Sequence, residues 1–337
     1  MRRDVALLIV ENMRKQGVIG IDVGGTKTLF ILFDERFQLI EKIKVKTPKQ
    51  HKADFLRVLI KSLDKLTQRA SRRDLKISTI GVGCAGSIDT HNGVVRSAAN
   101  IPALENFSFR KELRKANSKV SVFNDVHAAL YGEMKLGAAI GFKHVICIFI
   151  GTGIGGALAV DGQLYRGATG DAGDIGHYML QPMGPLTGSD RQGMLDDMAS
   201  RIAISGEAAT LAAKEWAPYL LKNVGTAVRE IKATALARAI RAGDKAIEEL
   251  VRSRAQIVGI VLSNLVDFFN PQLVVLGGGL TEALPAIIRS EVATGIKTHT
   301  TGNAADGVRV VTAALKDRAV ATGAAKLALD YRKQSSL

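Results

Sequence analysis

Two glycine-rich loops in matching surroundings constrain the fold of this chain more than any other feature. The first loop is Gly20-Ile-Asp-Val-Gly-Gly-Thr-Lys-Thr28, and the second is Ile150-Gly-Thr-Gly-Ile-Gly-Gly156. Each lies between two apolar runs of strand length. Because glycine has no Cβ, such loops let backbone N–H groups approach phosphate oxygens closely. The repetition favours two similar halves and phosphoryl transfer, although each loop alone is also compatible with a simple tight turn.

The first loop is not a Walker A loop. That motif requires a lysine directly after its last glycine and a helix thereafter. Here Thr26 follows Gly25, and residues 28–33 form an apolar run typical of a strand. We therefore expect the loop to be the turn of a β-hairpin.

The second loop matches the pattern GxGxxG, which is weak evidence by itself. The dinucleotide-binding fingerprint also requires a helix after its glycines. Instead, two strand-like runs flank Asp161-Gly162, a pair that favours a tight hairpin turn. This loop is therefore also predicted to belong to a hairpin.

Apolar periodicity predicts strands alternating with helices along the rest of the chain. The predicted strands are residues 18–23, 28–33, 39–45, 77–84, 120–123, 145–150, 157–160, 163–165, 273–276 and 308–312. The predicted helices are residues 54–70, 126–135, 256–269, 282–292 and 319–329. This order predicts a duplicated α/β fold with two domains around a central cleft, namely residues 1–122 plus 318–337 and residues 123–317.

The composition fits a globular α/β protein. Its 337 residues are 47% hydrophobic and 23% charged, and no apolar stretch approaches the roughly 18 residues of a membrane-spanning helix. We therefore expect no membrane partner. Cys84 and Cys147 lie far apart in strand-like runs and lack the spacing of metal ligands, so we expect reduced, buried thiols in a cytoplasmic protein.

Positive charge is concentrated in the first part of the chain. Residues 1–120 contain 24 Lys/Arg and 12 Asp/Glu, whereas the remaining residues contain 22 and 20. A basic half is compatible with nucleic acid or polyphosphate as a partner. The basic residues are spread along periodic segments rather than gathered between aromatic residues, which favours a solvated basic face that attracts anionic nucleotides.

Asn124-Asp125 separates a predicted strand from a predicted helix. Asp is a favoured N-cap and suits the positive end of a helix, so a structural role is one interpretation. The other is catalytic, because open α/β sheets place their sites at the carboxyl ends of strands. There, Asp125 would accept the proton of a substrate hydroxyl as that hydroxyl attacks a γ-phosphoryl group.

Asp22 and Lys27 flank the glycines of the first loop. A carboxylate beside phosphate-binding amides would repel a nucleotide unless a cation intervenes. We therefore expect Asp22 to hold Mg²⁺, through water, together with the phosphates. A turn-stabilising role is the alternative for Asp22, and Lys27 either contacts a phosphate or points to solvent.

Two further glycine-rich segments are candidate binding sites. Asp174 and His177 are three residues apart, and their paired donors and acceptors suit a ligand with hydroxyl groups, although a lone His is more often structural. Gly277-Gly-Gly279 lies between a predicted strand and a predicted helix. It allows either a flat ligand such as adenine to approach or only tight packing of the two elements.

The order of these segments resembles the ROK family (repressor, open reading frame, kinase) of the actin/hexokinase superfamily. Five motifs carry the resemblance: Asp22-Val-Gly-Gly-Thr-Lys-Thr28, Asn124-Asp125, Gly151-Thr-Gly-Ile-Gly-Gly156, Gly173-Asp-Ile-Gly-His177 and Val275-Leu-Gly-Gly-Gly279. The resemblance implies a duplicated actin-like ATPase fold of the ribonuclease H type, and a sugar kinase that uses ATP and Mg²⁺.

The resemblance also implies roles for individual residues. Asp125 is the expected catalytic base. The expected sugar-binding residues are Asn100, Asn124, Asp125, Asp174, His177 and Asp196. The expected nucleotide-binding residues are Asp22, Gly24, Gly25, Thr26, Lys27, Thr28, Gly151, Thr152, Gly153, Gly155, Gly277, Gly278 and Gly279.

Three departures from the family pattern affect the expected ligands. Residues 178–196 contain no Cys, so we expect no zinc site of the kind that many members form there. Asp174 and Asp196 stand where sugar-binding glutamates are usual, so hydrogen bonds to a given hydroxyl are lost or remade through water. Repressors of the family carry an N-terminal winged-helix domain, and the short segment before the first strand leads us to expect no nucleic-acid partner.

The sequence therefore predicts an ATP- and Mg²⁺-dependent hexose kinase similar to glucokinase, forming a cytoplasmic homodimer. Two alternatives remain. The presence of Asp174 and Asp196 in place of the usual glutamates is compatible with a non-catalytic, sugar-sensing protein that acts through a partner. The basic first part of the chain is compatible with a glucokinase that uses polyphosphate as its donor.

Overall fold

The computed structural model describes residues 15–114, 118–182 and 192–334. The chain divides into two compact units, the first comprising Met1–Leu136, Gly167–Asp171 and Arg318–Leu337, and the second Gly137–Arg166 and Ala172–Asp317. Helix α4 (Asp125–Leu136) belongs to the first unit because it packs along α13 (Ala319–Gln334). The sequence instead predicts the boundary before this helix, between residues 122 and 123.

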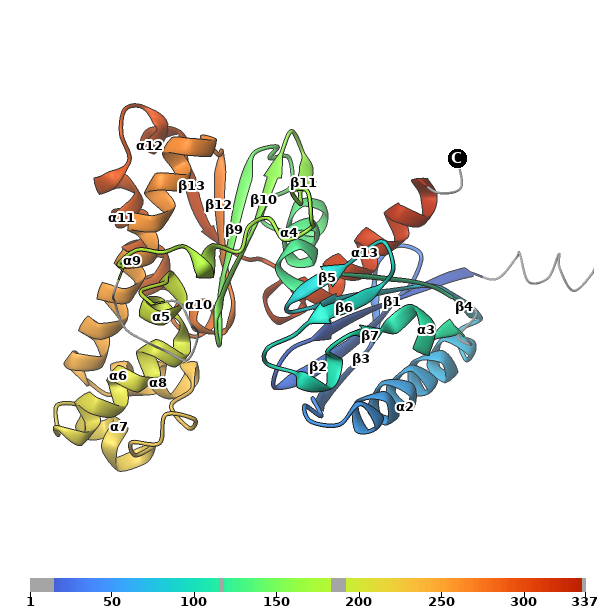
Figure 1. The fold of residues 1–337 in the computed structure, drawn as a ribbon, viewed down its shortest axis with the longest axis horizontal. Helices are drawn as coiled ribbons and strands as arrows, with labels where there is room; N and C mark the ends of the chain where they lie inside the picture. Colours follow the sequence, from blue (N-terminus) through green and yellow to red (C-terminus); the bar gives the residue numbers. More distant parts are fainter. Residues whose placement is uncertain (1–14, 115–117, 183–191, 335–337) are drawn as a thin grey trace, which may run out of the picture. The chain divides into compact units, whose positions relative to one another are not determined.

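The first unit is built on a five-stranded sheet with the strand order β3-β2-β1-β4-β8 (Figure 1). The strands are β1 (Lys15–Val23), β2 (Lys27–Phe33), β3 (Leu39–Lys46), β4 (Leu75–Cys84) and β8 (Lys119–Asn124). β1, β2 and β3 are antiparallel neighbours, whereas β4 pairs with β1 and β8 pairs with β4 in parallel. The carboxyl ends of β1, β4 and β8 therefore meet at one end of the sheet.

Helices cover both faces of this sheet. Helix α2 (Lys52–Ser71) contributes Phe55 to a core that includes Ile19 and Ile21 of β1. On the opposite face, Val18 of β1 belongs to a separate cluster with Ala321 of α13. Because successive strand residues point to opposite faces, burial on both sides explains why the strands are continuously apolar.

Helix α13 lies so close to the sheet that only glycine fits beneath it. A Cβ at Gly20 of β1 would lie 1.9 Å from the carbonyl oxygen of Ala321, and one at Gly81 of β4 would lie 2.0 Å from that of Ala324. Gly20, the first glycine of the first loop motif, is therefore required for packing of the helix on the sheet.

A small sheet extends the first unit beyond β4. Its strands β5 (Ser87–Asp89), β6 (Val94–Ser97) and β7 (Phe107–Ser108) are followed by helix α3 (Phe109–Glu112), and a 3₁₀ turn, η1 (Pro102–Leu104), lies between β6 and β7. The rings of Phe107 and Phe109 pack edge-on against Phe55, with centroids 5.6 and 6.1 Å away. These aromatic contacts anchor the small sheet on α2.

The second unit repeats the plan of the first. Its sheet has the order β11-β10-β9-β12-β13 (Figure 1), and β10 and β11 extend β9 in antiparallel fashion while β12 and β13 extend it in parallel. The strands are β9 (Val145–Ile150), β10 (Ile154–Val160), β11 (Gln163–Tyr165), β12 (Leu273–Gly277) and β13 (Arg309–Thr312). The predicted duplication of the α/β fold is confirmed, and the two glycine loops occupy equivalent positions, between β1 and β2 and between β9 and β10.

The second unit also contains a large helical segment. The helical elements are η3 (Ile175–His177), α5 (Leu195–Ala199), α6 (Arg201–Ala213), α7 (Pro218–Asn223), α8 (Ala233–Arg241), α9 (Lys245–Phe269), α10 (Gly279–Ala283), α11 (Pro285–His299) and α12 (Ala304–Gly307); a short turn, η4 (Lys316–Arg318), precedes α13. Helices α9 and α11 pack closely, and a Cβ at Gly295 would lie 2.8 Å from the Cα of Gly259.

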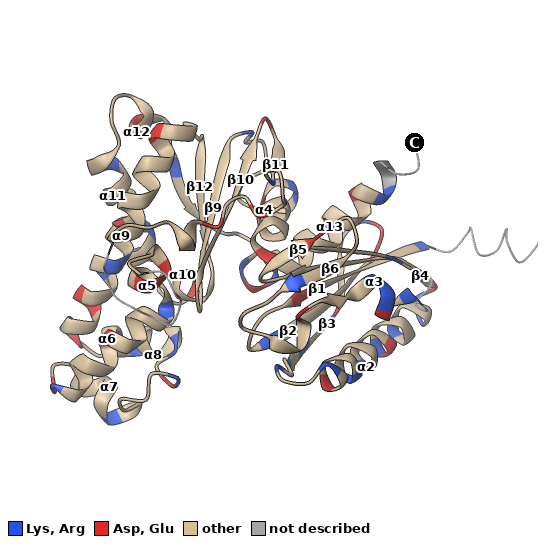
Figure 2. Cartoon of the chain, viewed as in Figure 1, with Lys and Arg blue, Asp and Glu red and all other residues tan. Residues whose placement is uncertain are grey.

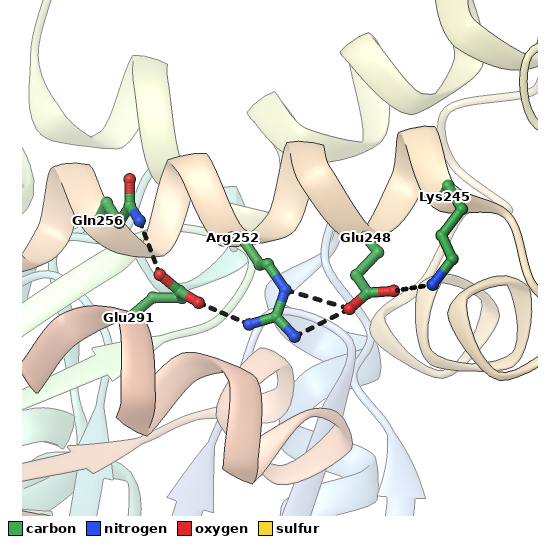
Figure 3. Close-up of polar contacts among 5 residues, drawn as sticks. All are labelled: Lys245, Glu248, Arg252, Gln256 and Glu291. Carbon is green, nitrogen blue, oxygen red and sulfur yellow. Dashed lines mark hydrogen bonds and ion pairs between the residues drawn. The ribbon is translucent and has the colours of Figure 1, made fainter. Parts of the chain in front are cut away.

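A chain of polar contacts joins α9 to α11 on the surface (Figure 3). Arg252 of α9 bonds to Glu248 on its own helix, with Nη2 and Oε1 2.8 Å apart, and to Glu291 of α11, with Nη1 and Oε1 2.5 Å apart. Gln256 donates to the other oxygen of Glu291 at 2.7 Å, and Lys245 lies 3.3 Å from Glu248. The bonds from Arg252 lower the pKa of Glu248. The contacts of Arg252 with Glu248 and Glu291 are partly buried, and together they link the two helices.

Two predicted helices differ from the observed ones. The helix predicted at residues 282–292 is in fact two helices, because Pro285 begins α11 and has no N–H with which to continue α10. Helix α9 begins at Lys245 rather than at residue 256. Helix α9 packs against α5 and α8, and these contacts are not contained in the local sequence pattern.

Charged side chains are spread over the elements of both units rather than gathered in one run (Figure 2). On the edge strand β3, Lys42, Lys44 and Lys46 are exposed at alternating positions, an arrangement that hinders pairing with another sheet. Cys84 and Cys147 are both buried, as predicted, and form no disulfide bond within the described residues. Within the described residues, no helix combines the length and the apolar character needed to cross a membrane.

Candidate active site

The first glycine loop is a tight turn that is stabilised by hydrogen bonds from the side chain of Thr47. The N–H of Gly24 donates to the carbonyl of Lys27 at 3.1 Å, and the Thr47 hydroxyl donates to the carbonyl of Gly24 at 2.7 Å. Thr28 is buried, and its hydroxyl lies 2.9 Å from that of Thr47. Thr26 and Lys27 are exposed. Thr28 therefore supports the turn from inside, whereas its two predecessors face solvent.

The loop also presents unused backbone donors beside Asn100. Within the described part of the chain, the N–H groups of Gly25 and Thr26 have no hydrogen-bond acceptor. A Cβ at Gly25 would lie 3.1 Å from the Cβ of Asn100, which is itself exposed. The structure therefore brings a predicted sugar-binding residue against a predicted phosphate-binding turn.

The parallel strands bring two carboxylates to the carboxyl end of the first sheet. Val23, Cys84 and Asn124 are aligned across β1, β4 and β8, so Asp22 and Asp125 lie at the same end. Burial raises the pKa of the Cys84 thiol well above its usual value, and the charges of Asp125 and Asp22 raise it further. Both carboxylates therefore lie near one buried, neutral thiol.

Asn124, rather than Asp125, is the residue that caps α4. Its Oδ1 accepts from the N–H groups of Val126 and His127 at 3.0 and 3.1 Å, and its Nδ2 donates to the carbonyl of Gly86 at 3.3 Å. Asp125 Oδ1 accepts from the Val126 N–H at 2.9 Å. The structural role that the sequence analysis considered for Asp125 belongs mainly to its neighbour, which uses its amide group for that purpose.

The carboxylate of Asp22 suits a Mg²⁺ ion that is bound with nucleotide phosphates. Mg²⁺ in such sites takes one or two carboxylates and keeps several water ligands. In the ranges that the structure describes, no group of three or more His, Cys, Asp or Glu side chains is placed to hold a metal ion by itself. The donors present therefore fit an ion whose other ligands are phosphate oxygens and water.

The second glycine loop occupies the equivalent turn of the second sheet. The N–H of Gly151 donates to the carbonyl of Gly153 at 2.8 Å, and Thr152 is exposed at the tip. The N–H groups of Thr152 and Gly153 have no acceptor among the described residues. Gly155 lies within β10, opposite Phe149 of β9. The turn thus offers two consecutive donors, while Gly155 belongs to the strand.

The carboxylate of Asp196, from α5, closes one side of this loop. Its Oδ1 accepts from the N–H of Ile154 at 2.5 Å, and a Cβ at Gly153 would lie 3.1 Å from the same oxygen. Glycine at position 153 therefore gives the carboxylate room to approach the turn.

Asp196 also lies with the predicted sugar-binding pair. Asp174 Oδ2 and His177 Nδ1 are 2.6 Å apart, and their side chains are 59% and 56% exposed. Burial raises the pKa of Asp196, and so does the charge of Asp174, whereas the Ile154 N–H and the charge of His177 lower it. The structure thus brings Asp196 together with Asp174 and His177, which lie in a different segment of the sequence.

Of the three glycines at the end of β12, two are required by packing and one faces open space. A Cβ at Gly277 would lie 2.6 Å from the ring of Phe149, and one at Gly278, where φ is +88°, would lie 2.5 Å from the carbonyl oxygen of Ile150. A Cβ at Gly279 would meet no atom within 4 Å. Packing therefore explains the first two glycines, and only the third leaves room for a ligand.

Two residues that shape the loops, Thr47 and Arg201, are not predicted from the sequence. Arg201 begins α6, and its Nη2 lies 3.3 Å from the hydroxyl of Thr152. The only available signal for Thr47 was its polarity after a strand. Arg201 had none, because the chain contains 46 Lys and Arg residues and this one lies outside every recognisable motif.

Comparison with known proteins places this fold and these motifs among sugar kinases. The model of the ROK family matches residues 18–331. A glucokinase of Thermotoga maritima is 30% identical to this chain, over 80% of this chain and 84% of its own length. The crystal structure of a ROK family glucokinase from Streptomyces griseus, in complex with glucose and AMPPNP, is similar with a TM-score of 0.80 at 28% identity, covering 93% of this chain and 99% of that chain.

Regulators share the same architecture. The structure of a ROK family transcriptional regulator, a homologue of the E. coli MLC protein, has a TM-score of 0.81 at 20% identity and covers 93% of this chain and 78% of that chain. At this identity the likeness concerns the fold alone. The similarity to the kinase structures confirms the predicted actin-like fold. The chain belongs to the ROK family.

Proposed function

We propose that this protein is an ATP-dependent sugar kinase, which transfers the γ-phosphoryl group of ATP to a hydroxyl group of a hexose. The observation that carries the proposal is the placement of Asp125. It lies with Asp22 at the carboxyl end of three parallel strands, and a glycine loop with two unused N–H groups follows β1 at the same end. This arrangement combines a base for a hydroxyl with donors for a phosphate.

In the first unit, Asp125 acts as the general base. Its carboxylate accepts the proton of the sugar hydroxyl while the hydroxyl oxygen attacks the γ-phosphorus and the bond to the β-phosphate oxygen breaks. The raised pKa of Cys84 keeps the neighbouring thiol neutral, so the thiol adds no negative charge near the base. Asn124 holds the start of α4 and thereby fixes the backbone of the base.

In the second unit, Asp174, His177 and Asp196 bind sugar hydroxyls. The contact between Asp174 and Nδ1 of His177 orients the imidazole ring, so that Nε2 is directed to a hydroxyl group. Asn100, beside the first glycine loop, is proposed to contribute a further hydrogen bond to the sugar. Asn124 is the weakest of the predicted sugar ligands, because both ends of its amide are already bonded.

Both glycine loops bind the phosphates of ATP, and the space at Gly279 accepts part of the adenosine. Bound Mg²⁺ would neutralise the charge on the phosphates beside Asp22 and Asp125. The residues of this chain provide the backbone N–H groups of Gly25, Thr26, Thr152 and Gly153. These donors are aimed by the turns before the ligand arrives, which is the condition for efficient stabilisation of developing charge.

Glucose is the first acceptor to test, because the similar proteins are named glucokinases. We also propose that the protein acts in the cytoplasm as a homodimer. Two buried cysteine thiols that form no disulfide bond among the described residues support a reducing compartment.

A coupled assay of ADP release over hexoses, amino sugars and N-acetylated sugars tests the proposed function. We expect rapid ADP release with at least one hexose in the presence of ATP and Mg²⁺. Calorimetric binding of a sugar without ADP release from any member of the panel would contradict the kinase and favour a sugar-sensing protein. Sugar phosphate formed from polyphosphate, but not from ATP, would instead identify polyphosphate as the donor.

A further inference from the structure

Arg201 is a half-buried cation beside the second glycine loop. It is the first residue of α6, and its backbone N–H donates to the carbonyl of Gly151 at 3.0 Å. Arg201 therefore belongs to the loop as much as to the helix. Its position is fixed by this bond before any ligand is present.

The side chain of Arg201 is aimed at the loop by two hydroxyl groups. Its Nη2 donates to the Thr152 hydroxyl at 3.3 Å, and its Nη1 lies 3.5 Å from the hydroxyl of Ser205. Ser205 is fully buried, and its hydroxyl lies 2.7 and 2.6 Å from the carbonyl oxygens of Arg201 and Ile231. The oxygen that the guanidinium approaches is thus held rigidly.

The positive charge of Arg201 has no negative partner in the described part of the chain. Other arginines of the second unit do have one, since Arg252 pairs with Glu248 and Glu291, and Arg254 pairs with Glu207. Burial lowers the pKa of the Arg201 guanidinium, as expected for a cation that is partly removed from water. A guanidinium has five N–H donors, and two hydroxyl contacts leave most of them available.

The second glycine loop also carries backbone N–H donors without an acceptor, next to the side chain of Arg201. The consecutive N–H groups of Thr152 and Gly153 have no acceptor among the described residues, whereas the next one, at Ile154, is taken by Asp196. An anion is therefore attracted toward Arg201 and Thr152 and repelled from the end of the loop that Asp196 occupies. Guanidinium groups bind phosphate oxygens in a planar, two-pronged geometry.

We propose that Arg201 binds the phosphate chain of the nucleoside triphosphate at the second glycine loop, in concert with the N–H groups of Thr152 and Gly153. This inference rests on the proposed kinase function and adds a residue that selects the triphosphate. Arg201 supplies a fixed positive charge there, and Thr152 and Ser205 hold it in place.

The test compares nucleotide binding by wild-type protein, Arg201→Gln and Arg201→Lys. Calorimetry with AMPPNP, AMP and adenosine measures the affinity. We expect Arg201→Gln to weaken AMPPNP binding by about 10-fold or more, because charge-assisted bonds to phosphate are lost. Adenosine binding should remain within about two-fold of wild type. Arg201→Lys should recover part of the AMPPNP affinity, because lysine keeps the positive charge but lacks the two-pronged donors of the guanidinium.

Arg238→Gln is the matched control. Arg238 lies on α8 of the same unit, is exposed, and bonds only to a carbonyl of its own helix among the described residues. The control removes the same charge and should leave all three affinities unchanged. Thermal melting of each variant checks that the loss of the Thr152 and Ser205 contacts has not unfolded the second unit.

Two results would overturn the inference. One is an AMPPNP affinity for Arg201→Gln equal to that of wild type. The other is an equal loss for AMPPNP and adenosine, which would mean that Arg201 only supports the loop. The proposed function fails separately, if wild-type protein binds AMPPNP but releases no ADP with any sugar.

Discussion

Asp125 and Asn124 show how adjacent residues divide structural and catalytic work. Asn124 satisfies the first N–H groups of α4, so the helix start does not depend on a carboxylate at position 125. A substitution at Asp125 that keeps its shape should therefore leave the helix intact. This separation makes the role of the base testable without unfolding the first unit.

We expect Asp125→Asn to lower the turnover number by roughly 100- to 10,000-fold, the usual contribution of a positioned base. Its amide oxygen can still accept from the N–H of Val126, so AMPPNP affinity and the melting temperature should change little. Steady-state kinetics and calorimetry measure the two effects. Asp64→Asn, on the exposed side of α2, is the control that removes the same charge. A variant as active as wild type would remove Asp125 from the mechanism.

The carboxylate of Asp196 is proposed to bind sugar, but its burial destabilises the folded protein. Burial raises its pKa, which means that its ionised form is disfavoured in the folded state. The destabilisation is absent below the unfolded pKa of about 3.9, grows as the pH rises toward the raised folded value, and is constant above it. Asparagine avoids this cost and can still accept from the N–H of Ile154.

We therefore expect Asp196→Asn to melt at a higher temperature than wild type at pH 7, with a difference that disappears as the pH falls to about 4. Glucose binding should weaken, because a carboxylate acceptor in the proposed sugar site becomes a mixed donor and acceptor. Calorimetric melting at both pH values measures the change in melting temperature, and titration with glucose measures the change in affinity. A variant less stable than wild type at pH 7 would contradict the assigned direction.

At the residue scale, local motifs predicted some members of the candidate site and not others. Asp174 and His177 were found because they are neighbours in a glycine-rich segment, and they are in contact. Thr28 belongs to the first loop motif, yet strand alternation buries it against Thr47. Arg201 could not be found, since its role depends on a contact with Thr152 from a distant segment.

At the level of helices and strands, close packing requires glycine at a position outside the loop motifs. Helix α13 approaches α4 so closely that a Cβ at Gly323 would lie 1.7 Å from the carbonyl oxygen of Ala128. The backbone atom cannot move aside as the end of a side chain can. The helix α6 offers a contrast, because a Cβ at Gly206 would meet no atom within 4 Å.

These two helical glycines give a matched pair of substitutions. Gly323→Ala should destabilise the protein by about 1–3 kcal/mol or more, because two helices must separate. Gly206→Ala should stabilise it by about 0.4–1 kcal/mol, because alanine has the better helix propensity and an unfolded chain with less freedom. Urea unfolding measures both changes. Equal effects of the two substitutions would show that helix propensity, not packing, governs position 323.

Elements with strong local signals were predicted from the sequence, and those fixed by distant contacts were not. Asp161 and Gly162 form the predicted hairpin turn, with φ of 52° and 77°, because this dipeptide favours that conformation by itself. Pro285 divides a predicted helix for an equally local reason, one that periodicity alone did not register. The assignment of α4 to the first unit depends on α13, which follows it by almost two hundred residues.

At the scale of the whole molecule, duplication explains why two glycine loops occur in one chain. In each sheet the central strand, β1 or β9, is antiparallel to the neighbour on one side and parallel to the neighbour on the other. The glycine loop follows this central strand in both sheets. The repeated pattern was visible in the sequence because both copies kept their glycines. Fold alone does not separate kinases from regulators in this family, so the functional proposal depends on the residues at the strand ends.

Transfer of the labelled terminal phosphate of ATP to glucose is the direct test of the proposed kinase activity. The protein is incubated with γ-labelled ATP, glucose and Mg²⁺, and the sugar fraction is analysed for label and mass. We predict labelled hexose monophosphate in equal amount to the ADP formed, with none when Mg²⁺ is removed by a chelator. Glucose that binds but stays unlabelled, with every other hexose of the panel equally unlabelled, would contradict the account.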